Sequence, residues 1–503
     1  MVTFNPFSLS SLDHALLAVY IPQNLCFRTT NHQQCLSQLQ DGIKLLLDNL
    51  PFLSGEVVPW TDSCAKPGEM RVQPGTTFAG IPMLTIKHFK DVILPPVLIE
   101  GGGSSQTDQA VAALDGEYFP LPLILPPSEP RPVMRLQANV MADGVILSMA
   151  FSHSVFDGTG TGRIHEMLAE CCRAAATQTS PNLPTDEKKE ELLRHVLTTA
   201  GEGEHPEIDH SGEVGQSYAY ESKEDGEAGQ AESMELLGTG LATRAFILSP
   251  EKLERLRKAC SELLPLLTRL SAKEQKEWPT FLSSNDVLTG AFAFCIEKAR
   301  KENGIDMSSK SRHLTFAVNF RKRLQAIPDC YLGNAVFPSR IYFQLPTDSD
   351  VDLDTLENSL DLQPLQESGI NVRDLLEIAN QAFQSRVGIS SYDDAFLRSF
   401  MAFMTKQEDY EATNLRYGNL IASSWRDLKI NSLDFGPGLG HVDNFELNIG
   451  VADGAMTVLP EVKRDLLATK KKAPWDVRVS LANQTMGSFQ QNTLIAWLAD
   501  KIV

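Results

Sequence analysis

The hydrophobic pattern of the first third of the chain alternates between two periods. Apolar residues recur at spacings of three and four over 36–50, LSQLQDGIKLLLDNL, which predicts an amphipathic helix that Pro51 ends. The stretch 144–152, GVILSMAFS, is apolar almost throughout, which indicates a strand buried on both faces. Further strands are expected over 83–86 and 132–139, and a helix over about 163–177 after a glycine-rich turn.

The second half of the chain resumes this alternation. A long helix is expected over 283–302. Ser284 or Asn285 is expected to cap it, because either side-chain oxygen can accept from the first free amides. A helix is also expected over 250–263, and strands over 244–248, 313–319, 340–345, 420–424, 446–451, 455–460 and 475–481.

Between the halves, over about 180–230, the composition changes. The stretch is rich in Glu, Asp, Gly, Ser and Pro, and it has too few large apolar residues to offset the entropy cost of ordering. We interpret it as a solvated acidic tether, with a partner-binding acidic segment as the alternative. The chain then divides into an N-terminal domain over 1–180, an acidic crossover linker over 181–240 and a C-terminal domain over 241–503.

Composition and charge exclude several classes of protein. The 503 residues are 42% hydrophobic and 22% charged, with a formal net charge of -19. No basic stripe is present, so a nucleic-acid partner is not expected. No apolar run reaches the roughly 18 residues of a membrane span, and no basic region precedes the first apolar residues. We therefore expect a cytoplasmic protein without a membrane partner.

The number and spacing of the cysteines also fit a cytoplasmic protein. Of the eight cysteines, only Cys171 and Cys172 lie close together, and no CxxC occurs. The sequence therefore predicts reduced cysteines that serve packing, with neither a disulfide framework nor a metal site.

His153 is the candidate catalytic residue. It follows the predicted strand over 144–152 and, with Asp157, forms HxxxD ahead of a glycine-rich stretch that begins at Gly158. An imidazole at a strand end has a pKa suited to taking a proton near neutral pH, although a hydrogen-bonded turn histidine would look similar. The same spacing joins His205 to Asp209, but that pair lies in the acidic stretch, where no scaffold is expected.

A second glycine-rich segment, DFGPGLG over 434–440, follows SSW over 423–425. Its glycines suggest a tight turn, which Asp434 could organise. Neither this segment nor GTGTG has the full spacing and acidic residue of a dinucleotide site.

Together these motifs resemble the BAHD acyltransferases, whose marks are HxxxDG and DFGWG. HSVFDG matches the first, and DFGPG matches the second except that Pro437 replaces Trp. The combination of SSW and DFGPGLG is most similar to the fungal branch with trichothecene 3-O-acetyltransferases. The likeness also includes SSLD near the start, LDNLPFLSGEV over 47–57, SSNDVLTGAFAF over 283–294, VNFRKRL over 318–324 and YLGNAV over 331–336.

The resemblance implies an α/β fold of two chloramphenicol-acetyltransferase-like domains, each a mixed sheet with helices, and an active-site channel at their interface. His153 would be the general base. Asp157 would complete the catalytic motif by pairing with a structural arginine, Arg321 or Arg323. Gly158, Asp434 and Gly436 would be structural motif residues.

The resemblance also implies the substrates. Acyl-CoA would be a co-substrate, with no permanently bound cofactor, and its acyl group, expected to be acetyl, would pass to a hydroxyl, or else an amine, of a hydrophobic secondary metabolite. We expect transfer in a ternary complex by a monomer. CoA would lie between the start of the helix at 283 and the strand at 423, which gives the contacts Ser283, Ser284, Ser423 and Ser424. Pro437 has no donor for a tetrahedral oxyanion.

Two other functions remain open on the sequence. A condensation domain of nonribosomal peptide synthesis shares the fold and carries HHxxxDG, but here the first of those positions is Ser152. A non-catalytic binding relative is the other alternative, and the intact His153 and Gly158 argue against it.

Overall fold

The computed structural model describes residues 4–503 apart from a set of segments. The positions outside the description are 17, 64, 76–81, 96–115, 126–128, 130, 209–217, 219–239, 272–277, 306–312, 325–326, 345–350, 414–415, 448–451 and 463–471. Most of the strand expected over 446–451 thus falls outside the described residues.

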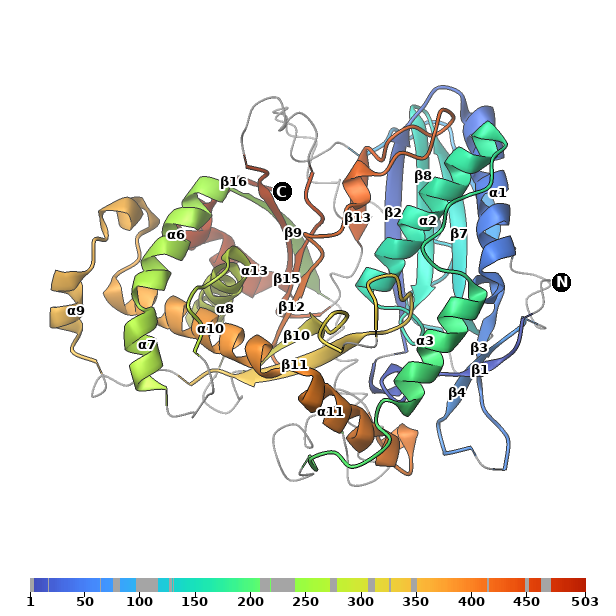
Figure 1. The fold of residues 1–503 in the computed structure, drawn as a ribbon. Coiled ribbons are helices and arrows are strands. Elements are labelled where there is room, and N and C mark those ends of the chain that lie inside the picture. The colour runs from blue at the N-terminus through green and yellow to red at the C-terminus, as the bar shows by residue number, and fades with distance from the viewer. Residues whose placement is uncertain are drawn as a thin grey trace.

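A five-stranded mixed sheet in the order β13-β2-β8-β7-β5 forms the centre of the N-terminal half. All nine residues of β8 are buried, as its apolar run predicts. Helices α1 (His32–Asn49) and α2 (Gly158–Thr177) lie side by side against this sheet (Figure 1), and their apolar faces fill the core. The strands are β2 (Tyr20–Arg28), β5 (Leu84–Phe89), β7 (Met134–Met141), β8 (Gly144–Ser152) and β13 (Asn444–Leu447). A small sheet beside them contains β1 (Phe7–Ser8), β3 (Glu56–Pro59), β4 (Met70–Gln73) and β6 (Arg131–Pro132).

A seven-stranded mixed sheet in the order β11-β10-β12-β14-β15-β9-β16 forms the C-terminal half. Its strands are β9 (Leu241–Leu248), β10 (His313–Asn319), β11 (Val336–Tyr342), β12 (Leu420–Ser424), β14 (Ala455–Val458), β15 (Trp475–Ala482) and β16 (Ala499–Ile502). Its helices are α6 (Pro250–Glu262), α7 (Leu264–Leu270), α8 (Ser284–Glu302), α9 (Leu353–Ser359), α10 (Val372–Ser391), α11 (Asp394–Lys406), α13 (Asn483–Gln491) and α14 (Thr493–Leu498). The strand expected over 340–345 begins earlier, at Val336.

Two helices begin at residues other than those the sequence predicted. Ser283 caps α8, because Asp286 three residues later completes a capping box with it; the expected cap at Ser284 or Asn285 was wrong. Helix α2 begins at Gly158, five residues before its expected start, with Asp157 as its cap.

The crossover between the halves is more ordered than its composition predicted. Its first part forms helix α3 (Glu187–Thr199), in which Leu193 and Leu197 are buried, and Tyr218 is 1% exposed among aromatic rings of the C-terminal half. The prediction of a solvated tether is therefore wrong for these residues. The composition of the whole stretch over 180–230 is acidic and polar, and we gave it more weight than the helical spacing of apolar residues within α3.

Strand β13 joins the two halves. It follows β12 in the chain but pairs antiparallel with β2, so it completes the N-terminal sheet (Figure 1). The division at 180 and 240 therefore stays a prediction from sequence. Strand β13 belongs to the predicted C-terminal domain by its position in the chain, but it pairs within the N-terminal sheet. In the part of the chain that the structure describes, no helix is long and apolar enough to cross a membrane.

Candidate active site

A cavity of about 590 Å³ lies where the two halves meet. The N-terminal half contributes His153 and the start of α2, and the C-terminal half contributes β10, β12 and β14. The walls near β2 are apolar and include Leu16, Val19, Ile21 and Leu123. The candidate base therefore lines a largely apolar cavity that is formed by a single chain.

His153 is held at the end of β8 by contacts that fix its ring. Its backbone N–H donates to the Val19 carbonyl at 2.9 Å, and its Nδ1 lies 3.1 Å from the Phe156 carbonyl oxygen. Because a carbonyl oxygen can only accept, Nδ1 carries the proton of the neutral ring. The lone pair is then on Nε2, which is the form that a general base needs.

Burial also favours this neutral form. Loss of hydration lowers the pKa of His153 below its ordinary value of 6.5, although the nearby Asp157 carboxylate and the Phe156 carbonyl act in the opposite direction. At neutral pH the ring is therefore unprotonated and ready to accept a proton.

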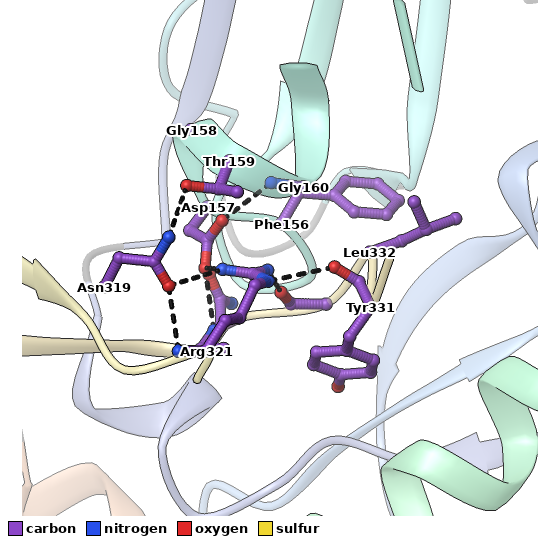
Figure 2. A network of polar contacts seen from close by, with 12 residues as sticks. Phe156, Asp157, Gly158, Thr159, Gly160, Asn319, Arg321, Tyr331 and Leu332 are labelled. Atoms are coloured by element: carbon purple, nitrogen blue, oxygen red, sulfur yellow. Dashed lines mark hydrogen bonds and ion pairs between the residues drawn. The ribbon is translucent and has the colours of Figure 1, made fainter. Parts of the chain in front are cut away.

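Asp157 is turned into a polar network under the histidine loop (Figure 2). One carboxylate oxygen accepts from the Gly160 N–H at 2.8 Å, and the other accepts from Arg321 Nη1 at 2.9 Å and from the Ala335 N–H at 2.7 Å. Its side chain is 2% exposed and that of Arg321 is 0% exposed. Asp157 therefore caps α2 and pairs with Arg321, while Arg323 donates to the carbonyls of Ile389 and Tyr392.

The loop over 331–335 carries the rest of this network. Arg321 donates to the carbonyls of Tyr331 and Gly333. Asn334 donates from Nδ2 to the His153 carbonyl at 2.9 Å and to the Asp13 carboxylate at 2.7 Å. The loop thus connects the buried ion pair with the backbone of the histidine.

Helix α3 holds the same loop from the other side. Its buried Glu190 accepts from the Leu332 N–H at 3.3 Å and from the Thr185 hydroxyl at 2.8 Å. Sequence reasoning missed both Glu190 and Asn334. Asn334 stood inside the recognised YLGNAV stretch, and Glu190 lay three residues before the first buried leucine of a short helical pattern.

Two glycines of the GTGTG stretch permit close packing at the start of α2. A Cβ at Gly158 would lie 2.7 Å from the Trp425 ring, and one at Gly160 would lie 1.9 Å from the Leu332 carbonyl oxygen. Both contacts require glycine, because real Cβ atoms do not approach so closely. Gly158 therefore brings the indole of Trp425 beside the histidine loop.

The DFGPG segment lies at the other end of α2. The Asp434 carbonyl accepts from Arg173, the Phe435 carbonyl accepts from Gln38, and Gly436 has a φ of +90°, which favours glycine. Arg173 is fifteen residues after Gly158, which is about 22 Å along a helix. Among the described residues, the segment does not line the cavity of His153, and these contacts join it to α1 and α2.

A second cavity of about 220 Å³ lies between the start of α8 and β12. Ser423 and Ser424 line both cavities, so the two spaces meet at the end of β12. Ser283 and Ser284 are not among its described lining residues. The Ser283 hydroxyl instead bonds Asp286 and Arg386.

Asn285 lines the second cavity in their place. In the part of the chain that the structure describes, its buried Oδ1 has no hydrogen-bond partner. No three His, Cys, Asp or Glu side chains within the described ranges are grouped as a metal site.

Known proteins share this organisation. Residues 19–172 match the trichothecene 3-O-acetyltransferase-like N-terminal domain, and residues 117–494 match the Transferase family. The chain is 39% identical to fumigaclavine B O-acetyltransferase easN of Aspergillus fumigatus over 99% of this chain and 98% of that protein. It is 30% identical to fumigaclavine B O-acetyltransferase ifgI of Penicillium roqueforti over 97% of each.

The fold agrees with a solved structure of F. sporotrichioides TRI101 complexed with coenzyme A and T-2. The TM-score is 0.68 at 17% sequence identity, and 98% of each chain is covered. The structural similarity confirms the expected α/β fold with two mixed sheets. The family match favours an acyltransferase over the condensation-domain and binding-protein alternatives. The chain therefore belongs to the Transferase family of BAHD acyltransferases and is a CoA-dependent O-acyltransferase.

Proposed function

We propose that the enzyme transfers an acetyl group from acetyl-CoA to a hydroxyl of a hydrophobic secondary metabolite, with His153 as the general base. The observation that carries this proposal is the contact of Nδ1 with the Phe156 carbonyl, which leaves the lone pair on Nε2 of a ring that lines the cavity. Its lowered pKa keeps that lone pair free at neutral pH.

The reaction follows from this arrangement. Nε2 takes the hydroxyl proton while the acceptor oxygen attacks the carbonyl carbon of the thioester. The tetrahedral intermediate then collapses with cleavage of the carbon–sulfur bond. The imidazolium returns its proton to the departing thiolate, which leaves an ester and free CoA. Asp157 takes no part in these transfers, because its oxygens are occupied by Arg321 and backbone amides.

The second cavity is the proposed path of the CoA arm. It meets the larger cavity at Ser423 and Ser424, so a thioester placed there would be reached from one side by the arm and from the other by the acceptor. Asn285 lines this cavity, and its side-chain amide is of a type that can bond an amide group of the arm. We retain Ser423 and Ser424 as contacts and prefer Asn285 to Ser283 and Ser284.

The apolar wall formed by Leu16, Val19, Ile21 and Leu123 supports a bulky, hydrophobic acceptor. Two relatives, at 39% and 30% identity over nearly their whole length, are named for fumigaclavine B. Fumigaclavine B is therefore the first acceptor to test with acetyl-CoA.

We also propose a cytoplasmic monomer. One chain supplies both walls of the cavity. The described cysteines are all free thiols, which suits a reducing compartment. Light scattering should give a mass near 55.5 kDa, and a stable dimer would contradict this.

Replacing His153 with alanine tests the mechanism. The variant should lose about 10² to 10⁴ in kcat, while calorimetry should show nearly unchanged acetyl-CoA affinity. His205→Ala is the matched control, because His205 has the same HxxxD spacing but is not among the described residues that line the two cavities. Near-normal turnover of His153→Ala would overturn the assignment of the base.

Mass spectrometry separates direct transfer from a covalent route. Enzyme mixed with acetyl-CoA alone should keep its unmodified mass, because acetyl passes straight to the acceptor. An acetylated enzyme that transfers its group when acceptor is added would contradict the ternary complex.

A further inference from the structure

The larger cavity has a floor formed by the free face of the C-terminal sheet. Thr315 of β10, Ile421 of β12 and Ala455 of β14 are aligned partners across this sheet, and all three line the cavity. The next residues of β12 and β14, Ala422 and Met456, belong to the helix-covered core. Side chains alternate along a strand, so the three aligned residues, which we call the floor row, point away from the helices towards the N-terminal half.

The floor row lies on the acceptor side of the reaction centre. Among the described lining residues, Ser423 and Ser424 belong to both cavities, whereas the floor row belongs only to the larger one. By the proposed path, the CoA arm arrives at these two serines. Two residues of a strand span roughly 7 Å, so Ile421 of the floor row lies that far beyond Ser423. The body of the acceptor therefore rests on the floor row.

Thr315 has a hydroxyl proton available for a ligand. Its Oγ1 accepts from the Gly418 N–H at 2.8 Å, and its side chain is buried. A hydroxyl has one proton to donate and two lone pairs, and within the described residues the Thr315 O–H has no acceptor of its own. A hydroxyl that accepts one hydrogen bond is also a stronger donor in the next.

Tyr417 adds a second hydroxyl beside Thr315. It precedes Gly418, whose N–H bonds Thr315, and it lines the same cavity. Its ring packs against the cluster that contains Tyr218 and Phe337, and in the described part of the chain no hydrogen-bond partner meets its hydroxyl. Burial raises the pKa of Tyr417 to about 12, so the phenol stays protonated and can donate at neutral pH.

The surroundings of these two hydroxyls are apolar. Ile421 and Ala455 lie beside them in the floor row, and the hydroxyl of Tyr20, the other tyrosine among the described lining residues, already donates to the Pro132 carbonyl. The charged residues among the described lining belong to the start of α2 and to loops: Asp157, Arg163, Lys322, Asp329 and Asp427. A few polar groups in an apolar pocket determine the orientation of a ligand.

We propose that Thr315 and Tyr417 are specificity-determining residues that donate hydrogen bonds to an atom of the acceptor remote from the hydroxyl that is acetylated. This atom is a carbonyl oxygen or an unprotonated ring nitrogen, and it lies roughly 7 Å from the reacting oxygen, the span of two residues of a strand. A metabolite that lacks such an atom leaves both hydroxyls buried and unpaired, which weakens its binding. This inference rests on the proposed acetyl transfer to a hydrophobic alcohol.

A matched pair of substrates tests the two hydroxyls. The pair is a decalin alcohol and the same alcohol with a ketone on its second ring, each assayed with acetyl-CoA by release of the thiol. One net hydrogen bond changes affinity by about 2- to 12-fold. Wild type should therefore prefer the keto alcohol in kcat/KM by about 10-fold.

Removing the hydroxyls should remove this preference. Tyr417→Phe and Thr315→Val should each reduce it by about 2- to 12-fold, mainly through the KM of the keto alcohol, and the double variant should turn over both alcohols equally. The dissociation constant of acetyl-CoA should stay within about twofold of wild type, because the floor row does not line the second cavity among its described residues.

Two further variants separate specificity from stability. Thr315→Val also leaves the Gly418 N–H without its acceptor, so its Tm is measured alongside, and Thr315→Ser, which keeps the hydroxyl, should retain the preference. Tyr342→Phe is the matched control, because Tyr342 is 45% exposed and is not among the described residues that line the two cavities.

The outcomes distinguish this inference from the proposed function. Equal kcat/KM of wild type for the two alcohols would overturn the inference alone, and so would a preference that survives in the double variant. The KM for fumigaclavine B is measured in the same variants, and a double-variant value within about twofold of wild type would also contradict the assignment. If wild type acetylates none of the three alcohols, the proposed acceptor class fails together with the inference.

Discussion

Replacing Asp157 with asparagine tests whether this carboxylate shapes the site or takes part in the chemistry. Its two oxygens accept from Arg321 and from two backbone N–H groups in a buried network. An amide would turn an NH₂ group towards one of these donors and leave the Arg321 guanidinium without its counter-charge. Breaking a buried ion pair from one side costs about 3 to 5 kcal/mol.

Thermal unfolding and kinetics measured together give the answer. A domain of 150 to 250 residues loses roughly 2 to 4 °C in Tm for each kcal/mol, so the variant should melt roughly 6 to 20 °C lower and lose turnover in parallel. Asp500→Asn is the matched control, because its 3.0 Å pair with Lys252 is largely solvated, at 55% and 29% exposure. Such a pair contributes about 0 to 1 kcal/mol.

The reasoning is refuted if Asp157→Asn melts like wild type and yet is inactive, since Asp157 would then act in the chemistry. A second variant checks the cause of any instability. Adding Arg321→Met to Asp157→Asn removes the unpaired charge and should restore part of the lost Tm. A further drop would show that the unpaired charge is not the main cost.

The remaining predictions concern pH and packing. Because burial lowers the pKa of His153 and only the neutral ring can act, kcat/KM should fall as pH drops through a value below 6.5 and stay level near neutrality; a midpoint above 6.5 would contradict this. Tyr218→Ala should destabilise the enzyme by about 3 to 5 kcal/mol, the cost of truncating a buried aromatic ring; an unchanged Tm would show that the acidic crossover is not anchored there. Gly158→Ala should cost about 1 to 3 kcal/mol through its clash with Trp425, and activity should fall with it in a turnover assay.

The elements that local pattern determines were predicted well from the sequence. The strand over 144–152 has the bounds of β8, and the amphipathic pattern over 36–50 lies within one residue of α1 at its C-terminal end. The start of α2 was placed too late, because the glycines after Asp157 resembled a turn. These glycines are explained by packing. Gly158 and Gly160 are helical residues, and because they lack a Cβ, Trp425 and Leu332 can pack against them.

The partners in the site were harder to predict, because they depend on residues far apart in the chain. Resemblance narrowed the partner of Asp157 to two arginines, and the structure selects Arg321. Nothing local indicated that Glu190 would meet a loop 142 positions later. Its helix was missed because a window of acidic and polar composition outweighed a short run of apolar spacings.

The pairing of β13 with β2 limits how such enzymes can be recombined. A chimera that joins the first half of one enzyme to the second half of another at the crossover would insert a foreign strand beside β2, in a register that matches Asn444 to Cys26. It would also place a foreign DFGPG loop against Gln38. Productive exchange therefore requires three fragments, with the segment from the end of β12 through β13 inherited from the donor of the first half. In such an exchange the apolar wall formed by Leu16, Val19, Ile21 and Leu123 stays with the first half.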